Sequence, residues 1–341
     1  MHYFLLEADT SIEIVERYLN KGPSTTIFVL EDEKVLGTIT NGDFRRYILN
    51  RKSDHRSAAG LCNKNFVFAE SLTYSDQEID QIFKSTFLQH IPVLNKDLTI
   101  DKIISRRNIG KPVEKCDVVI MAGGKGNRLM PLTENTPKPM LKINETPILE
   151  ILLKQLAANH FDKFYFSVNY KKDVIKEHFR DGIDFGVTVK YIEEDQFEGT
   201  AASLRLLKND VSDNVLVMNG DVLTRLNFDQ LSDYHFSNDN DITVVLNKVR
   251  TKIEYGVVEL DKSDIVGITE KPELEHFISA GIYLIKSSLL KYIPKSGFFD
   301  MPDLIDVASK NNLKVQGYPL TEYWLDIGHI ETLEEARRNW K

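Results

Sequence analysis

The chain has 341 residues, a formal net charge of -8 and 42% hydrophobic residues. This composition is ordinary for a globular protein and excludes wholesale disorder, and the length predicts about two domains. Because the chain is acidic, a broad basic face for nucleic acid is not expected, although one basic pocket for a phosphate ligand is compatible with that charge.

The amino-terminal sequence does not resemble a signal peptide, because acidic residues interrupt its short apolar run. No apolar run in the chain reaches the roughly 18 residues that a transmembrane helix needs. The two cysteines, Cys62 and Cys116, form no close pair and join no cluster with metal-ligand spacing. These features predict a cytoplasmic protein that contacts no membrane.

The first hundred residues contain two copies of one weak pattern, a helix followed by two strands that a tight turn joins. The predicted elements are a helix from 12, strands over 26–30 and 35–39 and a helix near 41 in the first copy, and a helix around 79–83 with strands over 90–94 and 99–104 in the second. One such unit cannot bury both faces of its short sheet, so we expect the two to pack as a pseudo-symmetric pair.

The first copy ends in Gly37-Thr-Ile-Thr-Asn-Gly-Asp-Phe-Arg-Arg46, which resembles the matching segment of CBS domains. The repeat is therefore similar to a CBS-domain pair, or Bateman module, predicted over residues 1–112. The resemblance implies that Thr40 and Asp43 hold the ribose of an adenine nucleotide, with the phosphate near backbone N–H groups. The second copy has Ser105 but no matching aspartate, so at most one site is expected. A purely structural or dimerising module is the alternative that the sequence leaves open.

A basic stretch without apolar periodicity, over 106–116, predicts a linker, and the second domain is predicted over 116–341. Strands and helices then alternate, which predicts a mostly parallel sheet covered on both faces. After residue 241 the strands crowd together, which predicts an antiparallel or mixed addition. The predicted elements are strands over 117–121, 163–168, 187–192 and 214–218, helices from 148, through 174–179 and over 200–207, and later strands over 242–246, 257–260 and 282–285.

The strongest chemical signal is Ala122-Gly-Gly-Lys-Gly-Asn-Arg128, with Pro137-Lys-Pro139 after it. Its glycines follow a buried strand and let backbone N–H groups approach phosphate oxygens. Lys125, Arg128 and Lys138 add positive charge, and a guanidinium suits bidentate contact with phosphate. The glycine spacing matches neither a P-loop nor GxGxxG, so a dinucleotide-binding dehydrogenase is disfavoured.

The longer motif AGGKGNRLMPLT…PKPML resembles the signature of sugar-1-phosphate nucleotidyltransferases, in the branch similar to mannose-1-phosphate guanylyltransferases. The resemblance continues through MNGD, YGVVEL, TEKP, SAGIY and WLDIG and covers roughly 117–341. It implies a Rossmann-like, GT-A-like mixed α/β fold that requires Mg²⁺. The implied reaction joins a nucleoside triphosphate to a hexose or amino-hexose 1-phosphate and releases pyrophosphate. Because the attacking phosphate is already anionic, positioning and charge neutralisation suffice, without a protein nucleophile.

The resemblance also implies a role for each matching residue. The implied catalytic residues are Arg128, Lys138, Asp221 and Asp326. The two aspartates are the implied Mg²⁺ ligands, a role that suits carboxylates at the end of a strand. The implied nucleotide-binding residues are Ala122, Gly123, Gly124, Gly126, Asn169, Glu198, Gly199 and Thr200. The implied sugar-phosphate-binding residues are Gly256, Glu270, Lys271 and Gly281.

The predictions of which base and which sugar are used rest on weaker sequence signals. Glu198-Gly-Thr-Ala201 resembles a family loop that lies against the base, with Glu198 in place of the usual leucine. This carboxylate either accepts hydrogen bonds from guanine or faces solvent, and the sequence leaves both open. Asn169 lies in a VNY segment that resembles the guanylyltransferase branch, so GTP is favoured. The alternative substrates are dTTP or UTP with glucose 1-phosphate.

The domain order resembles guanylyltransferases that supply GDP-activated amino sugars for nonulosonic-acid surface glycans, and a homo-oligomer is expected. A second functional class, a nucleotide-sensing regulatory protein on a non-catalytic scaffold, is the alternative. The presence of every implied phosphate-contacting and metal-binding residue speaks against it.

Overall fold

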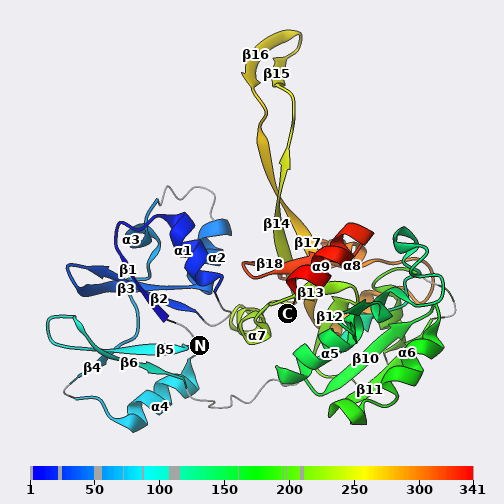
Figure 1. Cartoon of the computed structure of the whole chain (residues 1–341), viewed down its shortest axis with the longest axis horizontal. Coiled ribbons are helices and arrows are strands. Elements are labelled where there is room, and N and C mark those ends of the chain that lie inside the picture. The colour runs from blue at the N-terminus through cyan, green and yellow to red at the C-terminus, as the bar shows by residue number, and fades with distance from the viewer. Residues whose placement is uncertain are drawn as a thin grey trace.

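We describe a computed structural model of the chain. It describes residues 3–21, 25–49, 56–71, 73–86, 88–106, 116–159, 161–194, 196, 198–207 and 211–340. Figure 1 shows a smaller amino-terminal part, a larger body, and a long arm that projects from the body. Among the helices in these ranges, none is both long and apolar enough to cross a membrane.

The amino-terminal part holds two units of the same topology, as the repeat predicts. Its elements are β1 (Tyr3–Glu7), α1 (Ile12–Leu19), β2 (Thr26–Glu31), β3 (Lys34–Thr40), α2 (Asn41–Leu49), α3 (Ala58–Leu61), β4 (Ala69–Glu70), α4 (Asp76–Ser85), β5 (His90–Leu94) and β6 (Ile100–Ser105). Each sheet, β1-β2-β3 and β4-β5-β6, extends a parallel pair with one antiparallel strand. The sheets pack on each other through Phe28, Val35 and Leu94. The domain boundary predicted between 112 and 116 lies largely outside the described residues.

The body is built on a seven-stranded sheet. The strands of the body and the arm together are β7 (Cys116–Met121), β8 (Lys142–Ile143), β9 (Thr146–Pro147), β10 (Lys163–Val168), β11 (Thr188–Glu193), β12 (Asn214–Asn219), β13 (Val222–Thr224), β14 (Ile242–Lys252), β15 (Val257–Asp261), β16 (Asp264–Thr269), β17 (Glu273–Lys286), β18 (Val315–Pro319) and β19 (Trp324–Asp326). The order in the large sheet is β11-β10-β7-β12-β17-β14-β18. Every pair in it is parallel except the two that β17 makes, so the sheet is mixed and mostly parallel.

Helices cover the large sheet, and two apolar cores lie between the sheet and these helices. The helices are α5 (Ile148–Ala158), α6 (Lys172–Phe179), α7 (Phe228–Ser237), α8 (Met301–Lys310) and α9 (Ile330–Asn339), with 3-10 turns η1 (Asn127–Leu129), η2 (Lys138–Met140), η3 (Ile183–Phe185), η4 (Ala202–Leu206) and η5 (Ser287–Tyr292). Strand β7 divides its side chains between the cores, with Val118 and Ile120 in one and Val119 in the other. This alternation is the period of a strand buried on both faces.

The helix predicted over 200–207 is only the short turn η4, and its backbone partners explain the difference. The N–H of Thr200 donates to Asp300 Oδ1 at 2.6 Å, and its hydroxyl donates to the same oxygen at 2.9 Å. The N–H of Ala201 donates to the carbonyl of Phe299 at 3.1 Å. These contacts tie the segment to the loop before α8 instead of to a regular helix.

The arm is a two-stranded ribbon that continues β14 and β17 beyond the sheet. The two strands pair from Ile242↔Ile285 to Lys252↔Glu273, and β15 and β16 form an antiparallel hairpin further out. Strand β18 pairs with β14 only as far as Leu246, and β12 pairs with β17 only as far as Ile282. The strands that the sequence predicts over 242–246 and 282–285 are therefore only the inner ends of much longer strands.

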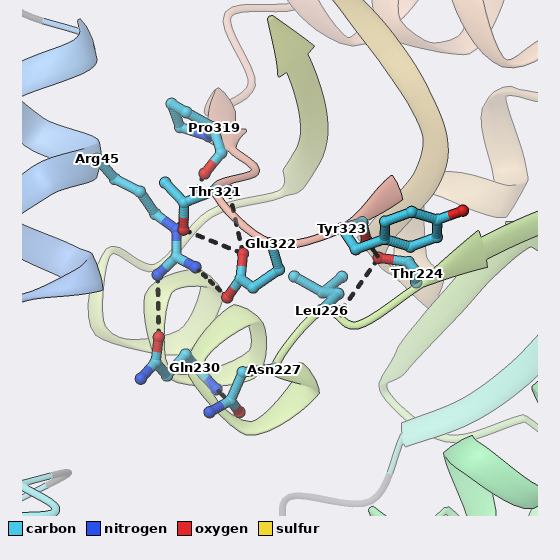
Figure 2. A network of polar contacts seen from close by, with 9 residues as sticks. All are labelled: Arg45, Thr224, Leu226, Asn227, Gln230, Pro319, Thr321, Glu322 and Tyr323. Atoms are coloured by element: carbon cyan, nitrogen blue, oxygen red, sulfur yellow. Dashed lines mark hydrogen bonds and ion pairs between the residues drawn. The ribbon is translucent and has the colours of Figure 1, made fainter. Parts of the chain in front are cut away.

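Arg45 in α2 joins the amino-terminal part to the body (Figure 2). It is 4% exposed, and its Nη2 lies 2.7 Å from Glu322 Oε1. Its Nε donates to the carbonyl of Pro319 at 2.9 Å, and its Nη1 donates to Gln230 Oε1 at 3.0 Å. The guanidinium carbon also lies 4.1 Å from the ring centroid of Tyr318. A buried, multiply bonded arginine fixes the contact between the two parts.

Candidate active site

The glycine loop crosses the carboxyl ends of β7 and β10. The N–H of Ala122 donates to Ser167 at 2.8 Å, and the N–H of Tyr170 donates to Gly123 at 3.3 Å. Gly126 has a φ of +65°, which favours glycine, and a Cβ there would lie 3.0 Å from Lys138 Cβ. The loop thus folds back onto η2 and places the stem of Lys138 beneath it.

The two aspartates lie side by side because a short antiparallel ladder aligns their strands. Val222, next to Asp221, pairs with Asp326, and the N–H of Ile327 donates to the carbonyl of Asp221 at 3.0 Å. Lys138 Nζ contacts Asp221 Oδ2. Burial raises the pKa of Asp326, and the neighbouring Asp221 carboxylate raises it further, while Lys138 and Arg128 oppose the rise.

Arg128 completes the cluster from the glycine loop. A Cβ at Gly328 would lie 3.2 Å from Asp326 Oδ2 and 3.4 Å from Arg128 Nη2, so the carboxylate and the guanidinium flank this glycine. Arg128 Nη1 also lies 3.1 Å from His329 Nε2. The structure therefore brings together all four implied catalytic residues. Sequence reasoning did not include His329, whose signal is its place directly after WLDIG.

The aspartate pair fits a divalent cation. Asp221 Oδ1 is buried and has no hydrogen-bond partner, so a polar ligand is needed there. Within the described ranges, no group of three or more His, Cys, Asp and Glu side chains is arranged to hold a metal. Two carboxylates still suit Mg²⁺, which usually takes its other ligands from phosphate oxygens and water.

Glu194 gives the edge of the loop a buried carboxylate. Asn169 Nδ2 donates to its carbonyl at 2.7 Å, and the Ser167 hydroxyl donates to its Oε1. Its Oε2 is buried without a hydrogen-bond partner. Burial raises the pKa of Glu194, and the hydroxyls of Ser167 and Ser203 oppose the rise. Sequence reasoning passed over this residue in favour of Glu198.

Glu198 faces outward instead. Its side chain is 44% exposed, and its Oε2 lies 3.2 Å from Arg205 Nη1. A Cβ at the adjacent Gly199 would lie 2.5 Å from the carbonyl oxygen of Phe299, and Thr200 is bonded to Asp300. This loop is therefore fixed against the segment before α8.

The four implied sugar-phosphate residues lie in two places. Gly281, in the sheet, would place a Cβ 2.6 Å from Asn219 Nδ2, close to the end of β12. Gly256 precedes β15, and Glu270 and Lys271 lie between β16 and β17, far out on the arm (Figure 1). The structure does not bring these three residues to the aspartate pair of their own chain.

Comparisons with known proteins identify the family of the larger part of the chain. The family model described as Nucleotidyl transferase matches residues 117–341. A mannose-1-phosphate guanylyltransferase of Mycobacterium tuberculosis is 33% identical over 221 residues, which are 63% of this chain and 62% of that protein. The bifunctional protein GlmU of Methanococcus maripaludis is 34% identical over 227 residues, 62% of this chain and 51% of GlmU. The chain thus spans about half the length of GlmU.

Two solved structures share the fold. One is a putative glucose-1-phosphate thymidylyltransferase from Bacillus anthracis, 23% identical with a TM-score of 0.55 over 65% of this chain and 94% of that one. The other is HddC from Yersinia pseudotuberculosis in complex with GMP-PN, 24% identical with a TM-score of 0.53 over 66% of this chain and all of that one. With the family match over more than half of its length, the chain belongs to the nucleotidyl transferase family.

Proposed function

We propose that the protein is a sugar-1-phosphate nucleotidyltransferase that uses GTP and a hexose or amino-hexose 1-phosphate. The observation that carries the proposal is the cluster of Asp221, Asp326, Lys138 and Arg128 beside the glycine loop. Opposite charges gathered at the carboxyl ends of strands suit a triphosphate held with a cation. The relatives named as guanylyltransferases support the same reaction class.

The reaction needs orientation more than acid–base chemistry. An oxygen of the sugar phosphate forms a bond to the α-phosphorus, and the bond from that phosphorus to the bridging oxygen of the β-phosphate breaks. Pyrophosphate leaves with the electron pair. Arg128 and Lys138 neutralise the phosphate charge, and the N–H groups of Gly123 and Gly124 orient the triphosphate. Mg²⁺, when held by Asp221 and Asp326, supplies further charge neutralisation.

The preference for GTP rests on Glu194. A carboxylate accepts hydrogen bonds from the N1–H and the amino group of guanine, and neither uracil nor thymine offers this pair of donors. Glu194 Oε2 is buried at the edge of the glycine loop and has a free acceptor. This makes Glu194, rather than Glu198, the base-selecting carboxylate in the proposal.

Pyrophosphate release tests the function directly. The full-length protein with Mg²⁺ is incubated with each of the four common triphosphates against several hexose and amino-hexose 1-phosphates. The proposal expects rapid release only when both substrates are present, with GTP the best triphosphate. Release from a triphosphate without a sugar phosphate, or no release in any combination, would contradict it.

We further infer that the amino-terminal repeat is a CBS-domain pair that takes an adenine nucleotide at one site. Thr40 donates from its N–H and its hydroxyl to Asp43 Oδ2, at 2.8 and 2.6 Å, and Arg46 contacts the other oxygen. Asp43 is therefore held at the start of α2, where a ribose diol would meet it. Calorimetry with AMP, ADP and ATP checks the site, and Asp43→Ala is expected to abolish the heat. If calorimetry of the unsubstituted protein shows no heat of binding with any of these nucleotides, the repeat has only a structural role.

A further inference from the structure

The arm is unsupported by the rest of the described chain. From Asn247↔Ile278 outward to Lys252↔Glu273, β14 and β17 pair only with each other. Figure 1 shows this ribbon and the β15–β16 hairpin standing clear of the body. A two-stranded ribbon is only marginally stable in water, so a projecting arm of this length needs a surface to rest on.

The outer hairpin carries an apolar face that nothing in the described chain covers. Its cross-strand pairs Val258↔Ile268 and Leu260↔Ile265 lie on one face. These four side chains are 45–63% exposed. Of the 22 large hydrophobic side chains exposed in the described ranges, eight lie between residues 255 and 278. A concentration of this kind marks an interaction surface.

Three of the four implied sugar-phosphate residues, Gly256, Glu270 and Lys271, are grouped on this arm. A Cβ at Gly256 would lie 3.0 Å from Glu270 Oε2, so Glu270 is directed at this glycine. Lys271 has a φ of +44°, a left-handed conformation that costs energy for a residue with a side chain and is typical of functional positions. The three residues lie near one another but away from the cluster of Asp221 and Asp326.

Distance along the ribbon prevents the arm from reaching its own site while it stays extended. Gly281 lies beside Asn219 at the site, and Lys271 precedes it by ten residues of almost continuous strand. At the rise of an extended strand this separation is roughly 30 Å, far beyond the reach of a lysine side chain. Folding the arm back would have to bend or break this paired ribbon, whereas a second copy of the chain can receive it unchanged.

The active-site edge offers a matching apolar surface. Met130 and Leu132 follow Arg128, and Ile330 follows His329; these three side chains are 42–49% exposed. The contact between Arg128 and His329 brings the two segments together. An apolar rim therefore borders the cluster at the place where an incoming hairpin would bury its own apolar face.

We propose that two copies of the chain exchange arms, so that Glu270 and Lys271 of one copy complete the sugar-phosphate site of the other. The exchange is reciprocal under two-fold symmetry, which gives each dimer two complete sites. It buries the apolar hairpin face of each copy and supplies a cation beside the partner's aspartate pair. The proposal rests on the proposed function, since the ligand of Lys271 is the sugar 1-phosphate.

Complementation between two inactive variants tests the exchange. Asp221→Asn removes a metal ligand but keeps the arm, and Lys271→Ala removes the arm's cation but keeps the aspartate pair. The two full-length variants are co-expressed with different affinity tags, and heterodimers are isolated on both tags in turn. If arms are exchanged, one of the two sites in each heterodimer has all its residues, and about half of the unsubstituted activity returns. Heterodimers as inactive as either variant alone would show that each arm serves its own chain and would overturn the proposal.

A second measurement does not depend on activity. The double substitution Leu260→Glu and Ile268→Glu places charge on the apolar hairpin face, and light scattering is expected to show the dimer become a monomer. Ile183→Glu is the matched control, because Ile183 is 73% exposed and lies in η3, outside the arm. A monomeric unsubstituted protein, or a double variant that stays dimeric, would overturn the exchange. Failure of the proposed function alone would instead abolish pyrophosphate release while leaving this dimer intact.

Discussion

Asp221 and Asp326 are about a hundred residues apart in the chain, and only the β13–β19 ladder brings their carboxylates together. Replacing either by asparagine keeps the shape but removes the charge that holds a cation. We expect Asp221→Asn and Asp326→Asn each to lower turnover by orders of magnitude. Steady-state pyrophosphate release measures this, with Asp162→Asn, an exposed residue before β10, as the control. Near-normal turnover in either variant would remove that aspartate from the site.

Substitutions at Glu194 and Glu198 are expected to have different effects on which triphosphate is preferred. Glu194→Gln replaces one of the two carboxyl oxygens with an amide nitrogen that cannot accept a hydrogen bond, so kcat/KM for GTP is expected to fall by roughly 10- to 100-fold relative to the other triphosphates. Glu198→Gln is the matched control and is expected to change this preference little, because Glu198 is exposed beside Arg205. Competition between GTP and UTP in one reaction reports the ratio. A larger shift from Glu198→Gln would reverse the assignment.

At this scale the sequence predicts which residue types gather at the site but not which way each points. Arg128, Lys138, Asp221 and Asp326 stand in motifs that resemble those of the nucleotidyltransferases, and the structure groups them. The choice between two nearby glutamates depends on burial, which the fold sets. Glu194 directly follows β11, and its N–H donates to the carbonyl of Val168 at the end of β10, whereas the Glu198 side chain is 44% exposed beside Arg205.

Among the elements of the body, α7 carries a buried histidine that makes stability depend on pH. His235 is 1% exposed, its Nδ1 lies 2.8 Å from Thr243 Oγ1, and its Nε2 has no hydrogen-bond partner. Burial, together with the charge of Lys286, lowers the pKa of His235 to about 4, although the carboxylates of Asp241 and Asp239 oppose the shift. In the unfolded chain this histidine takes up a proton near pH 6.5. The contribution of neutral His235 to the free energy of unfolding is therefore complete above pH 6.5 and is lost as the pH falls towards 4.

We expect this histidine to change the free energy of unfolding by on the order of 3 kcal/mol between pH 6.5 and 4. His235→Asn keeps a polar partner for Thr243 but does not titrate, so its melting temperature should fall less steeply over that interval. Thermal unfolding of both proteins at half-unit pH steps measures the difference. Parallel profiles would show that His235 is not the responsible group.

The order of elements is largely predictable from the sequence, and their lengths are not. Buried strands such as β7 and β10 and helix α5 have apolar periods that local sequence reveals. Within the arm the sequence predicts only the strand over 257–260, because β14 and β17 extend by pairing with each other across a long chain separation. The predicted helix over 200–207 fails for the same kind of reason, since Asp300 takes its backbone donor.

In the whole molecule, Arg45 is the contact that relates the two parts (Figure 2). The side chains of Arg45 and Glu322 are 5% and 6% exposed, and the Thr321 hydroxyl also donates to Glu322. Removing only the arginine leaves a buried carboxylate without a cation, which typically costs about 3–5 kcal/mol.

We therefore expect Arg45→Met to lower the thermal unfolding midpoint clearly, and Arg45→Met with Glu322→Gln to recover part of the loss. Arg46→Met is the control, because that side chain is 72% exposed. Differential scanning calorimetry of the full-length variants makes the comparison. If Arg45→Met unfolds at the same temperature as the unsubstituted protein, the contact of Arg45 with the body adds no stability.

The β13–β19 ladder also sets when the aspartate pair can first assemble during synthesis of the chain. Strand β13 leaves the ribosome about a hundred residues ahead of β19, and Trp324 Nε1 then anchors β19 by donating to the carbonyl of Ala280. Until residues 324–326 emerge, the nascent chain has one of the two carboxylates and no ladder to orient it. The proposed metal site therefore forms late in synthesis, after residues 324–326 have been made.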